Sequence, residues 1–321
     1  MTDDTPYEAV IVGGGPAGLS AALVLGRCRR RVLVCDAGRP RNAASQGLHG
    51  YLTRDGIHPA GFLDAARAEL ARYDNITLER GEVTDAERSG EGFRVTLADG
   101  RRFRARKLLL ATGLVDPLPP IPGLRELWGR SVHHCPYCDG WEWRDQALAV
   151  YGRGHAAAVA ALGLTVWSAD VVLLSDGPAE LSPRDRNRLR LHGILLREER
   201  VARLEGRDGR LERIVFENGG TLARHALFLS VGHRQHSDLP ARLGCAVGED
   251  GVVRTGRHET TDVEGLYVAG DASKDAQLVI VAAAEGARAA VAINSALLKE
   301  DLARREAAAR ARRPTPAVEP R

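Results

Sequence analysis

The chain has 321 residues, 44% of them hydrophobic and 27% charged, and a formal net charge of +3 at pH 7. Its length allows two domains with separate cores, and its composition is that of an ordinary globular protein. So small a net charge gives no reason to expect nucleic-acid binding, and the sequence has no run of about 18 apolar residues that would predict a membrane span.

The N-terminus and the cysteine content bear on the cellular compartment. Residues 1–15 are acidic rather than basic and lead straight into an apolar segment, so we expect no secretory signal. The five cysteines are an odd number and do not predict a disulfide scaffold. We therefore expect a cytoplasmic protein, in which a Cys-x-x-Cys pair is catalytic or metal-binding more often than structural.

The first predicted unit is a strand, a glycine turn, a helix and a second strand. Residues 7–12 are an apolar, β-branched run that meets the glycine turn GGGPAG at 13–18. Residues 16–30 have a helical pattern with a proline in the first turn, and residues 31–36 form a strand that ends in an acid. This order of elements around a GxGxxG turn predicts a dinucleotide-binding unit.

Each glycine of this turn has a physical role. Gly13 allows the tight turn, Gly15 lets a pyrophosphate approach the backbone, and Gly18 lets the helix pack closely on the strand. The phosphates would face the helix N-terminus, and Asp36 would accept hydrogen bonds from the ribose hydroxyls.

A second copy of the unit follows later in the chain. Residues 147–152 are again an apolar strand, followed by GxGxxA spacing at Gly152, Gly154 and Ala157. An Ala-rich helical run and the strand at 170–176 come next. The repeat predicts two dinucleotide-binding domains built on one plan.

The linker and the last segment indicate how the two domains are connected. The proline-rich linker at 115–123 is a natural domain boundary. Residues 265–273 read as a strand, and a long apolar helix is predicted to begin near Gln277; we expect both to return to the first domain. The predicted fold is therefore α/β, with two Rossmann-like domains and the second inserted into the first. The expected segments are 1–116 and 244–300 for the first domain, 117–243 for the inserted one, and 301–321 for a flexible basic tail.

The segment HHCPYCDGWEW at 133–143 carries the chemistry that the fold does not explain. A metal site would use His133, His134, Cys135 and Cys138, but adjacent histidines rarely converge on one ion and no second Cys-x-x-Cys completes a zinc site. An inert structural disulfide is the second reading. A redox pair is favoured, because the segment lies between two dinucleotide turns.

The residue types around the pair suit redox work. Pro136 can begin a helix, so Cys135 would lie at a helix N-terminus, where backbone amides and an imidazolium from His134 stabilise a thiolate. Asp139 is close enough in sequence to exchange a proton with the dithiol. The remaining cysteines are expected to be buried small hydrophobes: Cys28, Cys35 and Cys245.

Taken in order, several motifs resemble the low-molecular-weight thioredoxin reductase family of flavoproteins. They are GGGPAG, ATG at 111–113, CPYCDG at 135–140, the second glycine turn, and GLYVAGD at 265–271. The resemblance covers about residues 7 to 300. It implies an FAD-dependent thiol–disulfide oxidoreductase that exchanges electrons with NADPH or NADH, acts on a thioredoxin-like protein or a small disulfide or dithiol, and forms a homodimer.

The resemblance also implies roles for individual residues. Cys138 would face the flavin, Cys135 would attack the partner disulfide, and Asp139 would shuttle protons. The glycines of the second turn, Gly152 and Gly154, would hold the nicotinamide nucleotide. The residues implied to contact FAD are Gly13, Gly15, Gly18, Asp36, Gln46, Val83, Gly113, Gly270, Asp271, Gln277 and Leu278.

Two departures from the family pattern leave the electron donor open. The strand that should precede a 2′-phosphate site ends in Asp176, an acid that suits a free ribose diol, although Arg184, Arg186 and Arg188 follow. The CPYC motif and the segment around His49, which is either a base or a loop histidine, look similar to a branch of dithiol oxidases. The alternatives are thus a dithiol oxidase that uses oxygen, a ferredoxin-linked reductase, or a non-catalytic redox sensor.

Overall fold

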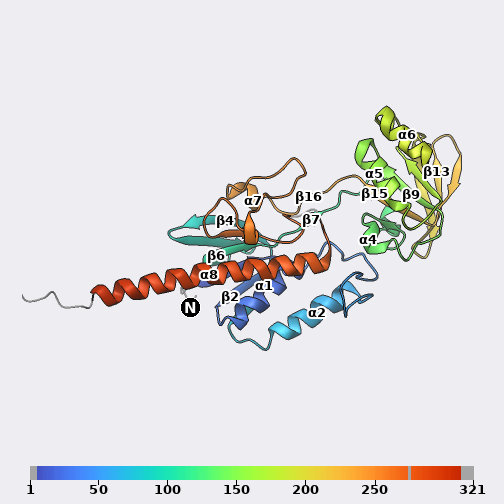
Figure 1. Ribbon diagram of the computed structural model, residues 1–321. Helices are drawn as coiled ribbons and strands as arrows, with labels where there is room; N and C mark the ends of the chain where they lie inside the picture. The colour runs from blue at the N-terminus through green and yellow to red at the C-terminus, as the bar shows by residue number, and fades with distance from the viewer. Residues whose placement is uncertain (1–5, 274–275, 312–321) are drawn as a thin grey trace, which may run out of the picture.

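The chain folds into two lobes (Figure 1); the sheet of the second is parallel, and that of the first is parallel except for the antiparallel pairs β6–β5 and β5–β4. The structure is a computed structural model that describes residues 6–273 and 276–311. The predicted fold class, with two Rossmann-type lobes, is confirmed. Residues 312–321 of the predicted tail lie outside the described residues.

Seven of the described strands form the sheet of the first lobe, in the order β3-β2-β1-β6-β5-β4, with β17 also paired to β6. Buried Val, Ile and Leu side chains fill the central strands because both faces of a parallel sheet are covered. The strands are β1 (Tyr7–Val12), β2 (Val32–Asp36), β3 (Ile76–Arg80), β4 (Val83–Ser89), β5 (Gly92–Leu97), β6 (Arg102–Leu110) and β17 (Leu266–Val268). Since β17 pairs in parallel with β6, the late segment returns to the first lobe.

Three helices accompany this sheet: α1 (Pro16–Arg27), α2 (Pro59–Leu70) and α8 (Val279–Ala311). Helix α8 packs on α1 so closely that a Cβ at Gly286 would overlap the Ala17 carbonyl oxygen. The helix begins two residues after the predicted Gln277, and it continues to Ala311, into the predicted tail. Ion pairs support the extension, because Asp301 pairs with Arg30 at 2.7 Å and Glu300 pairs with Arg106 at 2.8 Å.

By length and composition alone, α8 would also pass as a membrane-crossing helix, with a mean hydropathy of 1.3 in its most apolar window. In this structure 39% of that window is buried, and Ala289, Ile293 and Leu297 are fully buried in the first lobe. A helix in the core of a globular protein is equally apolar, so the mean hydropathy of α8 is accounted for by its burial in the first lobe.

The second lobe repeats the plan with a five-stranded parallel sheet in the order β11-β10-β9-β15-β8. Its strands are β8 (Val132–His133), β9 (Leu148–Gly152), β10 (Val171–Leu174), β11 (Leu195–Arg197) and β15 (Ala226–Ser230). Its helices are α3 (Leu124–Leu127), α4 (Pro136–Asp139), α5 (Gly154–Leu164) and α6 (Pro183–Leu191). A separate antiparallel sheet contains β12 (Val201–Arg207), β13 (Arg210–Phe216) and β14 (Thr221–Ala223).

Two very short strands join the lobes, β7 (Leu114–Val115) and β16 (Arg234–Gln235), which pair antiparallel. The chain therefore leaves the first lobe near the predicted boundary but returns earlier than residue 243. After β16, Leu239 in α7 (Leu239–Arg242) and Cys245 already pack in the core of the first lobe. A single turn of 3₁₀-helix (Arg257–Glu259) lies in this return segment.

Candidate active site

A cavity of about 840 Å³ lies where the two lobes meet. Its lining comes from the first glycine turn, the loop after β2, the segment before β7, and the segment that follows β17. The second lobe contributes Trp128, His133, His134, Cys138 and Asp139. The cavity thus brings the Cys-x-x-Cys segment to the dinucleotide turn of the other lobe.

The first glycine turn has the geometry of a phosphate-binding turn. Gly13 has φ +110°, and a Cβ there would overlap the Ala111 carbonyl oxygen. Gly18 lies behind the cavity, where a side chain would strike the Gly13 carbonyl oxygen. Gly15, by contrast, would present a Cβ to open space at the N-terminus of α1, which no side chain caps. The open face of the turn is therefore the face that a diphosphate would approach.

Most of the residues predicted to contact a dinucleotide line this cavity. They are Gly13, Gly15, Asp36, Val83, Gly113, Gly270, Asp271, Gln277 and Leu278. Gln46 does not: it is exposed, and its amide donates to the Ala44 carbonyl at 3.2 Å. The neighbouring Ser45 hydroxyl donates to the Gly47 carbonyl at 2.7 Å, and this local turn directs Gln46 away from the cavity.

Cys135 and Cys138 are joined by a disulfide, with their Cα atoms 5.3 Å apart. Cys135 is the N-cap residue of α4, and its sulfur accepts a hydrogen bond from the Cys138 amide at 3.1 Å. Cys138 lines the cavity, whereas Cys135 does not. Within residues 6–273 and 276–311, no three His, Cys, Asp or Glu side chains are grouped to hold a metal ion.

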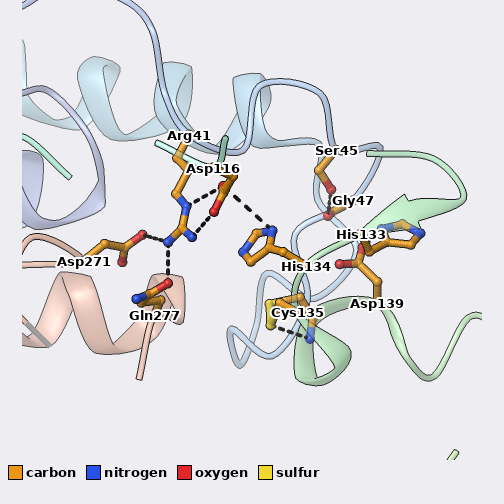
Figure 2. Close-up of a disulfide and its surroundings, with 11 residues drawn as sticks. Arg41, Ser45, Gly47, Asp116, His133, His134, Cys135, Asp139, Asp271 and Gln277 are labelled. Carbon is orange, nitrogen blue, oxygen red and sulfur yellow. Dashed lines mark hydrogen bonds and ion pairs between the residues drawn. A yellow bond between two sulfur atoms is a disulfide. The ribbon is translucent and has the colours of Figure 1, made fainter. Parts of the chain in front are cut away.

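The two histidines before the pair have different surroundings. His133 ends β8, and because successive residues of an extended chain point to opposite sides, His133 and His134 diverge. His134 Nδ1 lies 3.9 Å from Asp116 Oδ2, as Figure 2 shows. Burial lowers the pKa of His134 and outweighs the opposing effect of Asp116. The predicted His134 imidazolium is thus disfavoured at neutral pH, which corrects its expected role beside the thiolate.

Asp139 pairs with His133 rather than with His134. The Asp139 carboxylate lies 3.2 Å from His133 Nδ1, and both residues line the cavity (Figure 2). Sequence reasoning considered His133 only as a metal ligand. The available signal was its place at a strand end, one residue away from the opposite-facing His134.

Arg41, which sequence reasoning missed, joins three parts of the site (Figure 2). Its guanidinium donates to Asp271 at 2.9 Å, to the Gln277 side-chain oxygen at 2.6 Å, and to both oxygens of Asp116. Burial acts to lower the pKa of Arg41, but the hydrogen bonds and charges of the two acids outweigh it and raise the pKa. For Asp116, burial is likewise outweighed by Arg41, and its pKa is lowered. No spacing pattern marks an arginine in such a loop.

His49 is a further cavity residue, and it connects the lobes. Its Nδ1 lies 3.5 Å from Asp55 Oδ2 in the same loop, and its Nε2 lies 3.6 Å from Glu142 Oε1 of the second lobe. This places His49 between two carboxylates at the cavity edge.

The second glycine turn is placed differently from the first. Gly152 and Gly154 do not line the cavity, and the Gly154 amide already donates to the Ala179 carbonyl at 2.9 Å. The Arg153 guanidinium lies over the end of β10, where its Nε donates to the Ser175 carbonyl at 2.8 Å.

Asp176 is occupied by the chain itself. It accepts hydrogen bonds from the Tyr151 hydroxyl at 2.9 Å and from the Val201 amide at 2.7 Å. Burial, followed by Asp176, raises the pKa of Tyr151 to about 12, so this hydroxyl stays a donor. The carboxylate that was expected to receive a ribose diol therefore has an internal partner on each oxygen.

Of the arginines on α6, Arg186 pairs with Glu198 at 3.1 Å.

The other cysteines are not all buried as predicted. Cys28, at the end of α1, is exposed. Cys35 and Cys245 are buried, and burial raises the pKa of both thiols, that of Cys35 to about 12. Neither buried thiol is therefore a nucleophile at neutral pH.

A disulfide that shares one cavity with a dinucleotide turn defines the molecule as a two-lobed disulfide oxidoreductase. The family model described as pyridine nucleotide-disulphide oxidoreductase matches residues 7–286. The chain belongs to this family.

Named relatives agree with this assignment. A probable thioredoxin reductase of Arthroderma benhamiae is 32% identical over 92% of this chain and 81% of its own length. Thioredoxin reductase tcpT of Claviceps purpurea is 33% identical over 84% of this chain and 88% of its own. Among solved structures, HlmI has a TM-score of 0.92 and 41% identity, covering 97% of this chain and 99% of that one. The chain is thus a thioredoxin reductase-like, flavin-dependent disulfide oxidoreductase.

The cavity fits the FAD that this family uses. Gly15 leaves open space at a helix N-terminus, as a diphosphate requires.

Proposed function

We propose that the enzyme uses Cys135–Cys138 as a thiol–disulfide relay between the cofactor cavity and a thioredoxin-like protein or a small disulfide. The observation that carries this proposal is that Cys138 lines the cavity while Cys135 does not. When bound, FAD supplies a two-electron carrier. The residues that would hold it are those of the first glycine turn, Asp36, Val83, Gly113, Gly270, Asp271, Gln277 and Leu278.

The relay exchanges bonds in two steps. In the dithiol form, the Cys135 thiolate attacks one sulfur of the substrate disulfide, forms a mixed disulfide and releases the first substrate thiolate. Cys138 then attacks Cys135 Sγ, which restores the Cys135–Cys138 bond and releases the second substrate thiolate. Asp139, the next residue in the chain and a cavity residue, takes or gives the proton of the Cys138 thiol.

Exposed aromatic side chains beside the pair support a partner that docks there. Tyr137 is 80% exposed and Trp141 is 65% exposed. Large exposed rings next to a reactive pair provide apolar contact area for a substrate.

A second candidate function is oxidation of a small dithiol by oxygen. It is favoured by the second glycine turn, because the Gly154 amide and the Asp176 carboxylate are both bonded within the chain.

Anaerobic mixing separates the two candidates. With purified yellow enzyme, NADPH or NADH should bleach the flavin within seconds if a nicotinamide nucleotide is the donor. Fast bleaching by dithiothreitol but by neither nucleotide would overturn the reductase direction and support the oxidase. A Gly154→Ala variant is the matched control, because Gly154 has φ +68° and a side chain there strains the second turn alone. It should slow only the nucleotide reaction.

We also propose a cytoplasmic homodimer. A working dithiol and the exposed thiol of Cys28 suit a reducing compartment. One face of α8 exposes apolar side chains at spacings of seven and four residues: Val291, Leu298 and Leu302. An apolar helix face of this kind suits a second copy of the chain.

Light scattering tests the dimer. The wild-type protein should have twice the mass of one chain, and the double variant V291D/L298D should raise the dimer Kd at least about a hundredfold, because it buries unpaired charge. Leu195→Asp, which changes a leucine of the second lobe that is 65% exposed, should leave the mass unchanged. A monomeric wild type at micromolar concentration would contradict the proposal.

A further inference from the structure

We propose that His133 is a positioning residue that holds the Asp139 carboxylate in one orientation beside Cys138, and that Trp143 fixes the tautomer in which His133 does so. The inference rests on the proposed proton transfer by Asp139. It adds two residues, a histidine and a tryptophan, that act only through that carboxylate.

The tautomer follows from the partners of the ring. Trp143 Nε1 lies 2.9 Å from His133 Nε2. An indole N–H can only donate, so His133 Nε2 must accept. In the neutral ring, the proton is then on Nδ1, which lies 3.2 Å from Asp139 Oδ1 and donates to it.

The ring has little freedom to turn away. His133 is 5% exposed, at the end of β8, and its backbone pairs with Phe228 of β15. The His133 ring packs on Phe228 with centroids 5.5 Å apart and on Trp143 with centroids 6.1 Å apart. Asp139 therefore meets a donor whose position is set by the sheet of the second lobe.

This arrangement suits the proton transfer. Opening the Cys135–Cys138 disulfide takes two electrons and two protons and yields two thiols; Asp139 supplies one proton and solvent the other. The hydrogen bond to Asp139 Oδ1 fixes the orientation of the carboxylate, and the second oxygen, Oδ2, is left for the proposed proton transfer. The charged or titratable groups around Asp139 are His133 from β8, His134 after it, and the cysteines of α4.

Three substitutions isolate the contacts. His133→Phe keeps a ring but removes both hydrogen bonds. His133→Asn keeps an amide N–H near the place of Nδ1. Trp143→Phe removes only the indole N–H, and it remains informative if His133→Phe fails to fold. Asp139→Asn gives the reference for loss of the carboxylate itself.

The first readout is the tautomer, measured by ¹⁵N NMR on histidine-labelled holoenzyme. We expect the Nδ1–H form for His133 in the wild type, and a mixture of both tautomers in Trp143→Phe. An Nε2–H tautomer or a protonated ring in the wild type overturns the proposal.

The second readout is the rate at which dithiothreitol reduces the disulfide of the holoenzyme, followed by thiol alkylation and mass spectrometry between pH 5 and 9. Each rate is divided by the rate of dithiothreitol with a free small disulfide at the same pH. His133→Phe should be about tenfold slower at pH 7, because the Asp139 carboxylate would lose the donor that holds it in one orientation. His133→Asn should recover most of the rate, and Trp143→Phe should lie between.

The outcomes separate two failures. A slow Asp139→Asn enzyme beside an unaffected His133→Phe enzyme overturns the positioning by His133 alone. An Asp139→Asn enzyme as fast as the wild type overturns the proton transfer by Asp139, and the positioning role with it.

Discussion

A Cys138→Ser variant should stay yellow but lose at least about a thousandfold of its rate of flavin bleaching by dithiothreitol. The serine cannot form the disulfide, and Cys138 is the cysteine that lines the cavity. FAD binding should survive, because the residues that hold the cofactor lie in the first lobe. Stopped-flow absorbance under anaerobic conditions measures the rate, and released flavin measures the cofactor content.

Cys28→Ser is the matched control for this variant. It makes the same chemical change at an exposed, unpaired cysteine of the first lobe. Its rate should equal that of the wild type. If bleaching by dithiothreitol persists in Cys138→Ser, electrons reach the flavin by a path that does not use the pair, and the relay is wrong.

The second large effect is expected from Gly15→Ala. A Cβ at Gly15 meets no atom within 4 Å, so the variant should fold and melt like the wild type. Its new methyl group would occupy the space through which a diphosphate approaches the turn, so FAD affinity should fall at least about a hundredfold, or about 2.7 kcal/mol. Titration of apoprotein with FAD, followed by flavin fluorescence, measures this loss.

Two other glycines control for the methyl group itself. Gly163, in α5, also faces open space, so Gly163→Ala should change neither folding nor FAD affinity. Gly13→Ala should fail in both, because the residue has φ +110° and its side chain would overlap the Ala111 carbonyl oxygen. Wild-type affinity in Gly15→Ala would show that the diphosphate does not lie against this turn.

The parts of the fold that were predictable are those encoded over short distances. Residues 7–36 contain a complete strand, turn, helix and strand, so their pattern and their glycine spacing identify the unit. The point at which the chain re-enters the first lobe is hard to predict, because β16 has only two residues and carries no periodicity. The ion pairs of Asp301 with Arg30 and of Glu300 with Arg106 join residues far apart in the sequence, so no local pattern indicates them.

Site residues that belong to a local motif were predictable from the sequence. Residues whose hydrogen-bond partners are distant in the sequence were not. The cysteine pair and the residues Gly13 and Asp271 are recognisable from local motifs. The role of Arg41 is evident only from its hydrogen-bond partners Asp116 and Asp271, which are 75 and 230 residues away in the sequence. The internal partners of Asp176, Tyr151 and Val201, likewise cannot be inferred from a strand end.

The paired strands β7 and β16 have a consequence for the modularity of the molecule. Val115 pairs with Arg234 and Leu114 with Gln235, so the chain enters and leaves the second lobe through neighbouring, antiparallel positions. Removing the intervening residues would leave two ends about 5 Å apart, a gap that a two-residue hairpin turn closes. The second lobe is thus an insertion whose two ends lie side by side in the β7–β16 pair. The sheet of the first lobe contains no strand of the second lobe, because β17, which follows the second lobe in the chain, pairs directly with β6, which precedes it.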